Sequence, residues 1–288
     1  MLGSLLGAEM ESVDCTVMNS ETDLFGGRPP YQNWQQGSNV NNFLCTNDGE
    51  RSIVFMDEFE KTNEQIHNAL LIPFQEGKYD DRRDPAKRID CSKTIWILAT
   101  NRFDATIHQY HEDNKKGLES DDKILQDRLV KKLCGDLRKE SIAAFGAPLT
   151  GRIKDIVPFL RFSDAEATIV AHKGFMEYED EVANPVKLSD KKEEDRYIGN
   201  VRIEVKNDSS TFSHIARHSY LPQTGARSIF DGLERQVIEE MTDLYLKDGD
   251  DLHKDQPETL FEIGMGKDKE VEIKLIPQPD EVEEEEAA

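Results

Sequence analysis

Cysteine is scarce in this sequence, and its spacing suits neither a metal site nor a disulfide framework. The 288 residues include four cysteines, widely separated and with no CxxC pair: Cys15, Cys45, Cys91 and Cys134. Such spacing disfavours both a zinc site and a disulfide scaffold. We therefore expect reduced thiols that are mostly packed in the interior, where free cysteine usually lies.

Long apolar runs and positive charge are also scarce. No run approaches the roughly 18 residues of a membrane span, and the first residues lack the basic segment of a secretory signal. Lys and Arg total 36 against 58 Asp and Glu, a formal net charge of −22. This balance argues against a nucleic-acid surface, although a few local cations can still bind an anionic nucleotide. We expect a soluble intracellular protein of the cytoplasm, without nucleic-acid or membrane partners.

Apolar and polar segments alternate in the first half of the chain. "SIVFM" (52–56) is typical of a buried strand and "TIWILAT" (94–100) of a second apolar strand. Between them lies a helical pattern with Thr62 and Gln65 in capping-box spacing. Pro73 is expected to end or kink this helix, and a polar loop is expected after it. The order strand, helix, loop, strand predicts a parallel α/β sheet.

The second half of the chain has its own set of predicted elements. After a polar stretch, leucines at four-residue steps predict an amphipathic helix within 121–139. The other predicted elements are a short strand at 156–162, a helix after the N-cap-like Ser163, a half-buried strand at 201–205, a long helix from Ala226 to beyond Met241, and a β-hairpin turning at 266–269.

These elements predict two domains. The first is an α/β large domain at 1–162, and the second is a smaller α+β C-terminal domain at 163–277. The second domain contains a charged insertion at 178–197, expected to be exposed. The tail at 278–288 is low-complexity acidic sequence and is expected to be disordered.

The strand at 52–56 runs directly into two carboxylates, Asp57 and Glu58. A phosphate-hydrolysing site can use such a pair, because an Asp at the strand end can bind Mg²⁺ while the neighbouring Glu orients the attacking water. The same residues could instead lie in the first turn of a helix, where acids interact favourably with the helix dipole. The pair alone leaves both interpretations open.

Four further stretches, together with this strand, resemble the Clp-type AAA+ unfoldases in order and spacing across about residues 14–247. They are "LFGGRPPYQNWQQGS", "ILATN", "FGAPLTGRIKDIVPF" and "TGARSIFDGLERQV". The resemblance implies that Tyr31 and Trp34 lie in a pore loop that grips polypeptide. It also implies that Asn101 is a sensor that places water, that Arg152 is a finger reaching a neighbouring subunit's nucleotide, and that Arg227 contacts phosphate in cis.

Each of these residues also has an ordinary structural interpretation. Asn101 could be a turn residue, and Arg152 could extend over a surface. Arg227 could cap or pair locally, and Tyr31 and Trp34 could pack in the core as aromatic residues often do. The joint order of the segments, rather than any single residue, favours the family interpretation.

The resemblance implies an AAA+ parallel sheet of the P-loop NTPase type with helices on both faces, binding ATP and Mg²⁺ and working in a ring of AAA+ subunits. The sequence departs from the family at the phosphate loop, because it contains no GxxxxGK[ST] motif. We therefore expect an incomplete sheet that lacks the first strand and the phosphate loop, with open flanks along both predicted strands. Gly151 also stands where the family commonly has Asn.

Three functions follow from these observations. The first is a Clp-type ATPase subunit that unfolds or disaggregates polypeptides, present here as a piece of a longer chain or as a shortened gene model. The second is a pseudo-ATPase interaction module that has no turnover of its own. The third is an unrelated hydrolase that binds a metal through Asp57, Glu58 and His67, although no HExxH spacing is present.

Overall fold

The computed structural model describes residues 2–30, 34–187, 197–248 and 258–276. The chain divides into two compact units, Met1–Leu160 and Arg161–Ala288. Each unit has a hydrophobic core of its own. Each therefore contains the apolar burial on which a separate domain depends.

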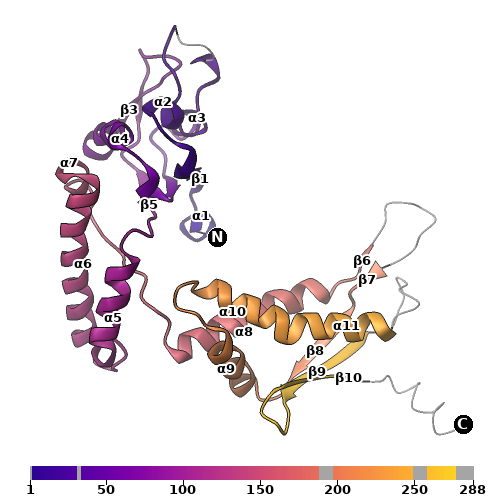
Figure 1. Ribbon diagram of the computed structural model, residues 1–288. Coiled ribbons are helices and arrows are strands. Elements are labelled where there is room, and N and C mark those ends of the chain that lie inside the picture. The colour runs from indigo at the N-terminus through magenta and orange to yellow at the C-terminus, as the bar shows by residue number, and fades with distance from the viewer. Residues whose placement is uncertain (1, 31–33, 188–196, 249–257, 277–288) are drawn as a thin grey trace, which may run out of the picture. The chain divides into compact units, whose positions relative to one another are not determined.

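A parallel three-stranded sheet lies at the centre of the first unit (Figure 1). Its middle strand is β2 (Ser52–Asp57), which pairs in parallel with β1 (Glu9–Asp14) on one edge and with β5 (Thr94–Leu98) on the other. The side chains of Ile53 and Val54 are fully buried, as expected for a strand covered on both faces. The predicted parallel α/β sheet is confirmed, but the predicted open flanks of β2 are wrong because both of its edges are paired.

The sequence does not predict β1, because Val13 is the only buried residue among its six. This strand forms through its ladder with β2, in which Glu9 lies opposite Ser52 and Asp14 lies opposite Asp57. At the other side of the sheet, β5 pairs with β2 alone within the described residues.

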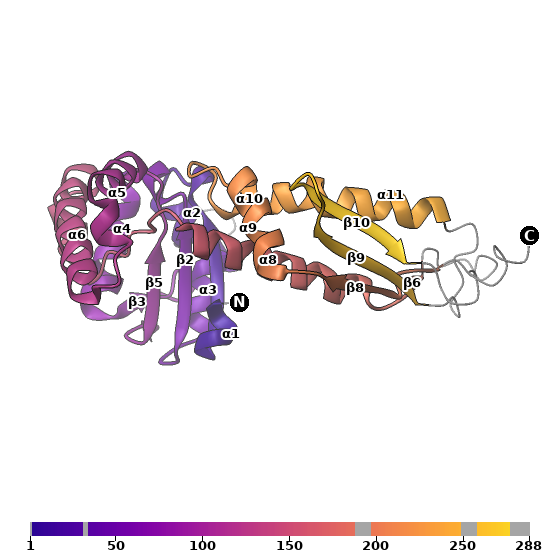
Figure 2. The same ribbon diagram turned by 90° about the horizontal axis from the view of Figure 1, so that it is seen from below.

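Helices flank this sheet (Figure 2). They are α1 (Leu2–Leu6), α2 (Glu21–Phe25), α3 (Asn39–Thr46), α4 (Glu64–Glu76), α5 (Asp104–Leu118), α6 (Lys123–Phe145) and α7 (Ala147–Thr150), with the 3-10 turns η1 (Cys15–Val17), η2 (Trp34–Gln36) and η3 (Phe59–Lys61). α6 is the predicted amphipathic helix, and it buries Leu133 and Leu137. These side chains join Ile66 and Leu70 of α4 in the core.

α4 begins one residue later than its capping-box spacing predicts. Its N-cap is Asn63, whose side chain accepts hydrogen bonds from the backbone N–H groups of Gln65 and Ile66 at 3.0 and 3.3 Å. Thr62 is not the cap, because its hydroxyl donates to the Phe59 carbonyl at 2.6 Å. An Asn cap performs the same function as a Thr cap, so the helix forms despite the shift.

α4 also extends past its predicted end. The helix continues through Pro73 to Glu76, and the N–H of Gly77 bonds to the Pro73 carbonyl at 3.1 Å. Gly77 has a φ of 61°, the left-handed conformation that ends many helices. Pro73 removes one backbone donor, but its ring is buried, so packing offsets part of that loss.

Three other segments differ from prediction. The expected polar loop contains a hairpin of β3 (Lys78–Asp80) and β4 (Arg88–Asp90), because Tyr79 and Ile89 pair across it and are buried. The polar stretch before α6 is helix α5, whose only buried residue is His111, so apolar periodicity does not show it. The predicted strand at 156–162 is absent, since this segment has no ladder partner in the described part of the chain.

The second unit combines helices with a separate three-stranded sheet of order β10–β9–β8 (Figure 1). Its elements are α8 (Asp164–Val182), β6 (Val186–Lys187), β7 (Tyr197–Ile198), β8 (Val201–Val205), α9 (Asp208–Ser219), α10 (Ala226–Leu233), the π-helical turn η4 (Glu234–Ile238), α11 (Glu239–Asp248), β9 (Thr259–Met265) and β10 (Val271–Ile276). The predicted N-cap at Ser163 is confirmed, and Ser163 also forms a capping box with Glu166. The strand at 201–205 and the hairpin at 266–269 are also confirmed.

Two predictions on this unit are only partly covered by the description. The charged insertion includes the end of α8 and the short β6–β7 pair, while 188–196 lies outside the described residues. The acidic tail at 278–288 also lies outside them.

All four cysteines are free thiols, and Cys15 and Cys91 are buried.

Candidate functional site

The two carboxylates lie where β2 leaves the sheet. Asp57 is the last residue of the strand and is exposed, while Glu58 is half-buried and has a φ of 52°. The N–H of Glu58 donates to Asp57 Oδ1 at 3.0 Å. The turn therefore brings the acids out of the apolar strand interior, and their charges remain close to solvent.

Asn101 reaches this pair from the neighbouring strand. Its side-chain Nδ2 donates to Glu58 Oε1 at 3.2 Å. The backbone after β5 is held beside β2, because Ala99 N–H donates to the Met56 carbonyl and Phe59 N–H donates to the Ala99 carbonyl, each at 2.8 Å. The structure thus brings together Asp57, Glu58 and Asn101, three of the residues that the sequence predicts for the site.

A third carboxylate, Glu60, belongs to the same cluster and is not predicted from the sequence. Its Oε1 accepts the backbone N–H of Asn101 at 3.3 Å, while its Oε2 is buried without a hydrogen-bond partner in the described residues. The nearby thiol of Cys15 has its pKa raised to about 12, first by burial and then by the charges of Asp14, Asp57 and Glu60. The cluster therefore makes this end of the sheet locally negative and favours a bound cation.

Arg152 lies at the end of α7 and is turned toward α4. Its guanidinium donates to Gln75 Oε1, with the Nε bond at 3.1 Å, and to the Pro148 carbonyl. These contacts hold the half-buried side chain against the C-terminal part of α4 rather than against the acid pair.

The remaining predicted site residues lie elsewhere. Trp34 begins η2 and is half-buried, whereas Tyr31 lies outside the described residues. Arg227 is exposed in the first turn of α10, in the second unit. None of these positions tests the role that the resemblance implies for the residue.

A hollow of the first unit lies beside His67, between the start of α4 and the end of α6. It has a volume of about 410 Å³, and Phe145 and Leu149 line its apolar side. The centroid of the His67 ring lies 5.4 Å from that of Phe59, with the two rings tilted by 33°, and His67 Nε2 forms a hydrogen bond with the Thr62 hydroxyl at 2.9 Å. His67 is thus engaged within the protein rather than directed at Asp57.

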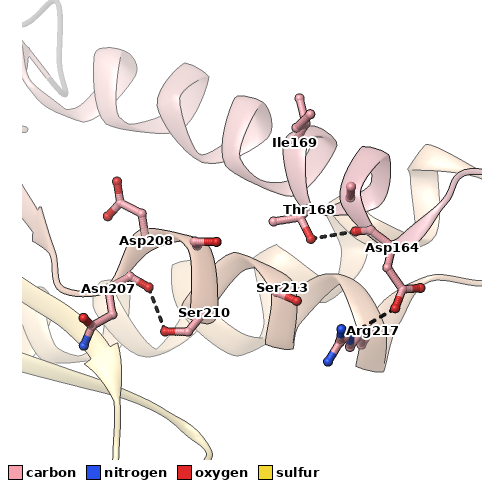
Figure 3. Close-up of a pocket in the computed structure, with 10 residues that line it drawn as sticks. Asp164, Thr168, Ile169, Asn207, Asp208, Ser210, Ser213 and Arg217 are labelled. Carbon is pink, nitrogen blue, oxygen red and sulfur yellow. Dashed lines mark hydrogen bonds and ion pairs between the residues drawn. The ribbon is translucent and has the colours of Figure 1, made fainter. Parts of the chain in front are cut away.

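The second unit has a wider groove of about 1120 Å³ between the start of α8 and most of the length of α9 (Figure 3). Asp164 and Arg217 form an ion pair of 3.2 Å at one end, and Asp208 and Ser210 lie at the other. None of the predicted site residues lines it. The sequence therefore predicts no catalytic or binding residue in this groove.

The described residues offer no metal-binding cluster of the kind that the hydrolase alternative needs. No group of three or more His, Cys, Asp and Glu side chains among them is placed to hold a metal ion. The structure therefore supplies no ligand set for the metal hydrolase with His67. Within the same residues, no helix has both the length and the apolar character that a membrane crossing needs.

The side chains of Asp57, Glu58 and Asn101 can be compared with those that usually hold Mg²⁺ and a nucleotide. Magnesium is usually held by one or two carboxylates together with substrate phosphates and water. Asp57 offers an exposed carboxylate, and Glu58 with Asn101 offers groups that can orient a water. The sequence contains no GxxxxGK[ST] cradle. The residues present are therefore suited to binding the Mg²⁺ ion of Mg-ATP. They do not include the phosphate-binding loop that would hold the ATP phosphates.

Comparison with known proteins gives related results for most of the chain. A profile of the AAA domain (Cdc48 subfamily) matches residues 10–156. The chaperone protein ClpB of Chlamydia caviae is 22% identical over 250 residues, which is 87% of this chain and 25% of that protein. ClpB of Staphylococcus epidermidis is 22% identical over 254 residues, 88% of this chain and 25% of that protein. ClpB of Staphylococcus aureus (strain N315) is 22% identical over 226 residues, 78% of this chain and 22% of that protein. The chain thus spans about a quarter of the length of these curated relatives.

Proposed function

Since this chain belongs to the Clp-type AAA+ ATPase family, we propose that it supplies the acidic, water-orienting half of an ATP-hydrolysing site. The single observation that carries the proposal is the contact of Asn101 with Glu58 at the ends of two paired parallel strands. These two polar side chains follow neighbouring strands and lie 3.2 Å apart, which supports a joint role in orienting a water.

In this proposal each residue has a distinct role. Asp57 holds Mg²⁺ through its exposed carboxylate, and Glu58 accepts a hydrogen bond from the attacking water and orients it. Asn101 fixes the Glu58 carboxylate through their hydrogen bond. When bound, ATP would supply the phosphoryl group, and Mg²⁺ would supply the positive charge next to Asp57.

The wider activity proposed is ATP-driven unfolding or disaggregation of polypeptides in a ring of AAA+ subunits. Tyr31 and Trp34 would grip the polypeptide, and Arg152 would reach the nucleotide of a neighbouring subunit. Arg227 would contact phosphate within its own subunit. Arginine suits both of these roles because its charge is permanent and it can donate several hydrogen bonds to phosphate oxygens. The ClpB relatives, which are named as chaperones, support this proposal.

A second candidate is an interaction module that joins an AAA+ ring without turning over ATP. The observation that favours it is the absence of a GxxxxGK[ST] motif from the sequence. In that case Arg152 would act on a partner's nucleotide, and the carboxylate pair would be a remnant without a ligand.

Calorimetry with Mg-ATP on the 288-residue protein separates the two candidates. Micromolar binding that Asp57→Ala abolishes would support an ATPase half-site that recruits nucleotide without the usual cradle. Absence of binding by a sample with native far-UV circular dichroism would contradict nucleotide recruitment by this chain alone. The interaction module would then be favoured if adding the protein to an intact ring ATPase changed that ring's turnover and Arg152→Ala removed the change.

A further inference from the structure

A second group of buried polar side chains lies away from the acid site, where the β3–β4 hairpin meets α2 and α3. Asn41 is fully buried, and Asp81 and Arg82 are 5% and 8% exposed. Buried polar and charged groups are costly unless they are hydrogen-bonded or paired. Such a group therefore marks a position where the fold depends on specific contacts.

Asn41 joins α3 to the turn of the hairpin. Its Oδ1 accepts from the Tyr79 hydroxyl at 2.7 Å and from the Arg82 N–H at 2.8 Å. Its Nδ2 donates to Asp81 Oδ1 at 3.0 Å. Burial acts to raise the pKa of Asp81, but hydrogen bonds from the side chain of Asn41, the N–H of Arg83 and the side chains of Cys45 and Arg83 outweigh it and lower this pKa to about 2. Asp81 thus stays ionised in the buried cluster.

Arg82 joins the same turn to α2. Its guanidinium pairs with Glu21 and lies over the rings of Phe25 and Tyr79, 5.7 and 5.9 Å from their centroids. Its Nε is buried without a hydrogen-bond partner in the described residues. The Arg82 side chain is 9% exposed against 45% for Glu21, so the pair connects the interior to the surface.

α2 and α3 flank the loop that carries Trp34, of which residues 26–30 and 34–37 are described. The Ser38 hydroxyl caps α3 and donates to the Leu24 carbonyl of α2 at 2.8 Å, so the two ends are joined at their base. Asn42 Nδ2 donates to the Gln36 carbonyl at 2.9 Å and fixes the later part of the loop. Gly37 has a φ of 67°, and a Cβ there would lie 3.2 Å from Cδ of Arg83.

We infer that Arg82 is a positioning residue for this loop, and that the hairpin turn at 81–87 sets how Trp34 is presented. The inference rests on the proposed function, in which Trp34 grips polypeptide. Arg82 fixes α2 through Glu21 and Phe25, while its own N–H is fixed to α3 through Asn41. Both ends of the loop are therefore tied to one residue of a neighbouring hairpin.

Trp34 itself reports on this arrangement. The chain has two tryptophans, Trp34 and Trp96, so Trp96→Phe leaves Trp34 as the single tryptophan, which can be excited selectively over the tyrosines. In that background, Arg82→Met keeps an apolar stem between Phe25 and Tyr79 but removes the ion pair with Glu21. Because Trp34 is half-buried, release of the loop should raise its acrylamide quenching constant about twofold and shorten its anisotropy decay. Arg82→Lys should restore much of the wild-type value.

Two further variants keep the test decisive. Glu21→Gln breaks the same pair from its solvent side, without changing the buried cluster, and should shift Trp34 quenching in the same direction. Arg88 lies on the same hairpin and forms an exposed ion pair with Glu76 of α4. Arg88→Met removes this pair and should leave the quenching of Trp34 unchanged. If Arg82→Met and Glu21→Gln lower only the urea midpoint, with native-state quenching unchanged, Arg82 has a structural role alone and the inference is overturned.

A binding measurement separates this inference from the proposed function. The probe is a fluorescently labelled, reduced and carboxymethylated α-lactalbumin, which stays unfolded. Weaker binding of this probe by both Trp34→Ala and Arg82→Met would support the two ideas together. If Trp34→Ala binds it as the wild type does, gripping by Trp34 fails, while the quenching result still decides whether Arg82 positions the loop.

Discussion

Glu58 adopts a backbone conformation that residues with a Cβ reach only at a cost. Its φ of 52° is in the left-handed region, where a Cβ crowds the following carbonyl oxygen. In this conformation its carboxylate meets Asn101. Strained backbone conformations of this kind often occur at functional sites, where contacts with the surrounding structure hold the residue in place.

This strain can be measured with a pair of substitutions. Glu58→Ala and Glu58→Gly both remove the carboxylate and its bond with Asn101, but only glycine relieves the crowding. We expect Glu58→Gly to be more stable than Glu58→Ala by about 1 kcal/mol in urea unfolding. Equal stabilities of the two variants would show that the turn around Glu58 carries no backbone strain.

His67 gives the first unit a pH-dependent stability. Burial lowers the pKa of His67, and the charge of Glu64 opposes this only in part. The folded pKa therefore lies below the unfolded value of about 6.5, so the contribution is fully present above that pH and declines as pH falls through it. The ring packs on Phe59 and Phe145, where a charged imidazolium would be poorly solvated.

Urea unfolding followed by tryptophan fluorescence tests this dependence, because both tryptophans lie in the first unit. The unfolding free energy should fall between pH 7 and pH 5, and His67→Gln should reduce that fall. His172→Gln, in the second unit, serves as the matched control and should leave the pH dependence of this transition unchanged. An identical decline in wild type and His67→Gln would contradict the role of His67.

At the scale of elements, the long helix of the second unit contains a π-helical turn. η4 joins α10 to α11. Val237 in η4 and Met241 in α11 are both buried. A π turn holds more residues per turn than an α turn, so it changes which face the following helix presents. The single apolar face that the sequence predicts from Ala226 onward is therefore composed of two faces joined at η4.

Removing one residue from this turn should leave the orientation of α11 nearly unchanged. A π turn contains one residue more than an α turn, so deletion of the exposed Arg235 should restore α-helical geometry and keep Met241 on the buried face. Insertion of one Ala after Arg235 should instead turn the following residues by about 100° and expose Met241, and we expect the second unit then to lose about 3 kcal/mol or more. Circular dichroism should show earlier melting of the insertion variant alone, while tryptophan fluorescence of the first unit stays unchanged. Equal melting of the deletion and insertion variants would contradict the role of η4.

The sequence predicts elements whose burial shows in their own residues. β2, β5 and β8 have apolar runs or alternation, and the ends of β2 and β5 place Asp57, Glu58 and Asn101 together because parallel neighbours end at one edge. β1 and α5 bury few apolar side chains, so they depend on tertiary contacts that local pattern does not contain.

Side-chain networks are the part that sequence analysis misses. The segment at 156–162 has a strand's apolar character but no described ladder partner, and Phe159 is 87% exposed. Glu60 and the cluster of Asn41, Asp81 and Arg82 depend on contacts between residues about 40 positions apart. Spacing within the chain carries no signal for such contacts.

At the scale of the whole molecule, the chain has a large excess of negative charge and two separate cores. The formal net charge is −22, and most ion pairs in the described residues involve partly exposed side chains that contribute little each. Stability therefore depends mainly on the apolar burial of each unit. A change within one core should leave the other core largely intact.

The sheet of the first unit has a strand order that matches the order of synthesis. β1 pairs with β2 and β2 pairs with β5, so each described strand joins the free edge left by the one before it. A ribosome releases the chain from its N-terminus at about 5–20 residues per second. No strand has to be inserted between two that have already paired. These three strands can therefore assemble by successive addition while the second unit is still being translated.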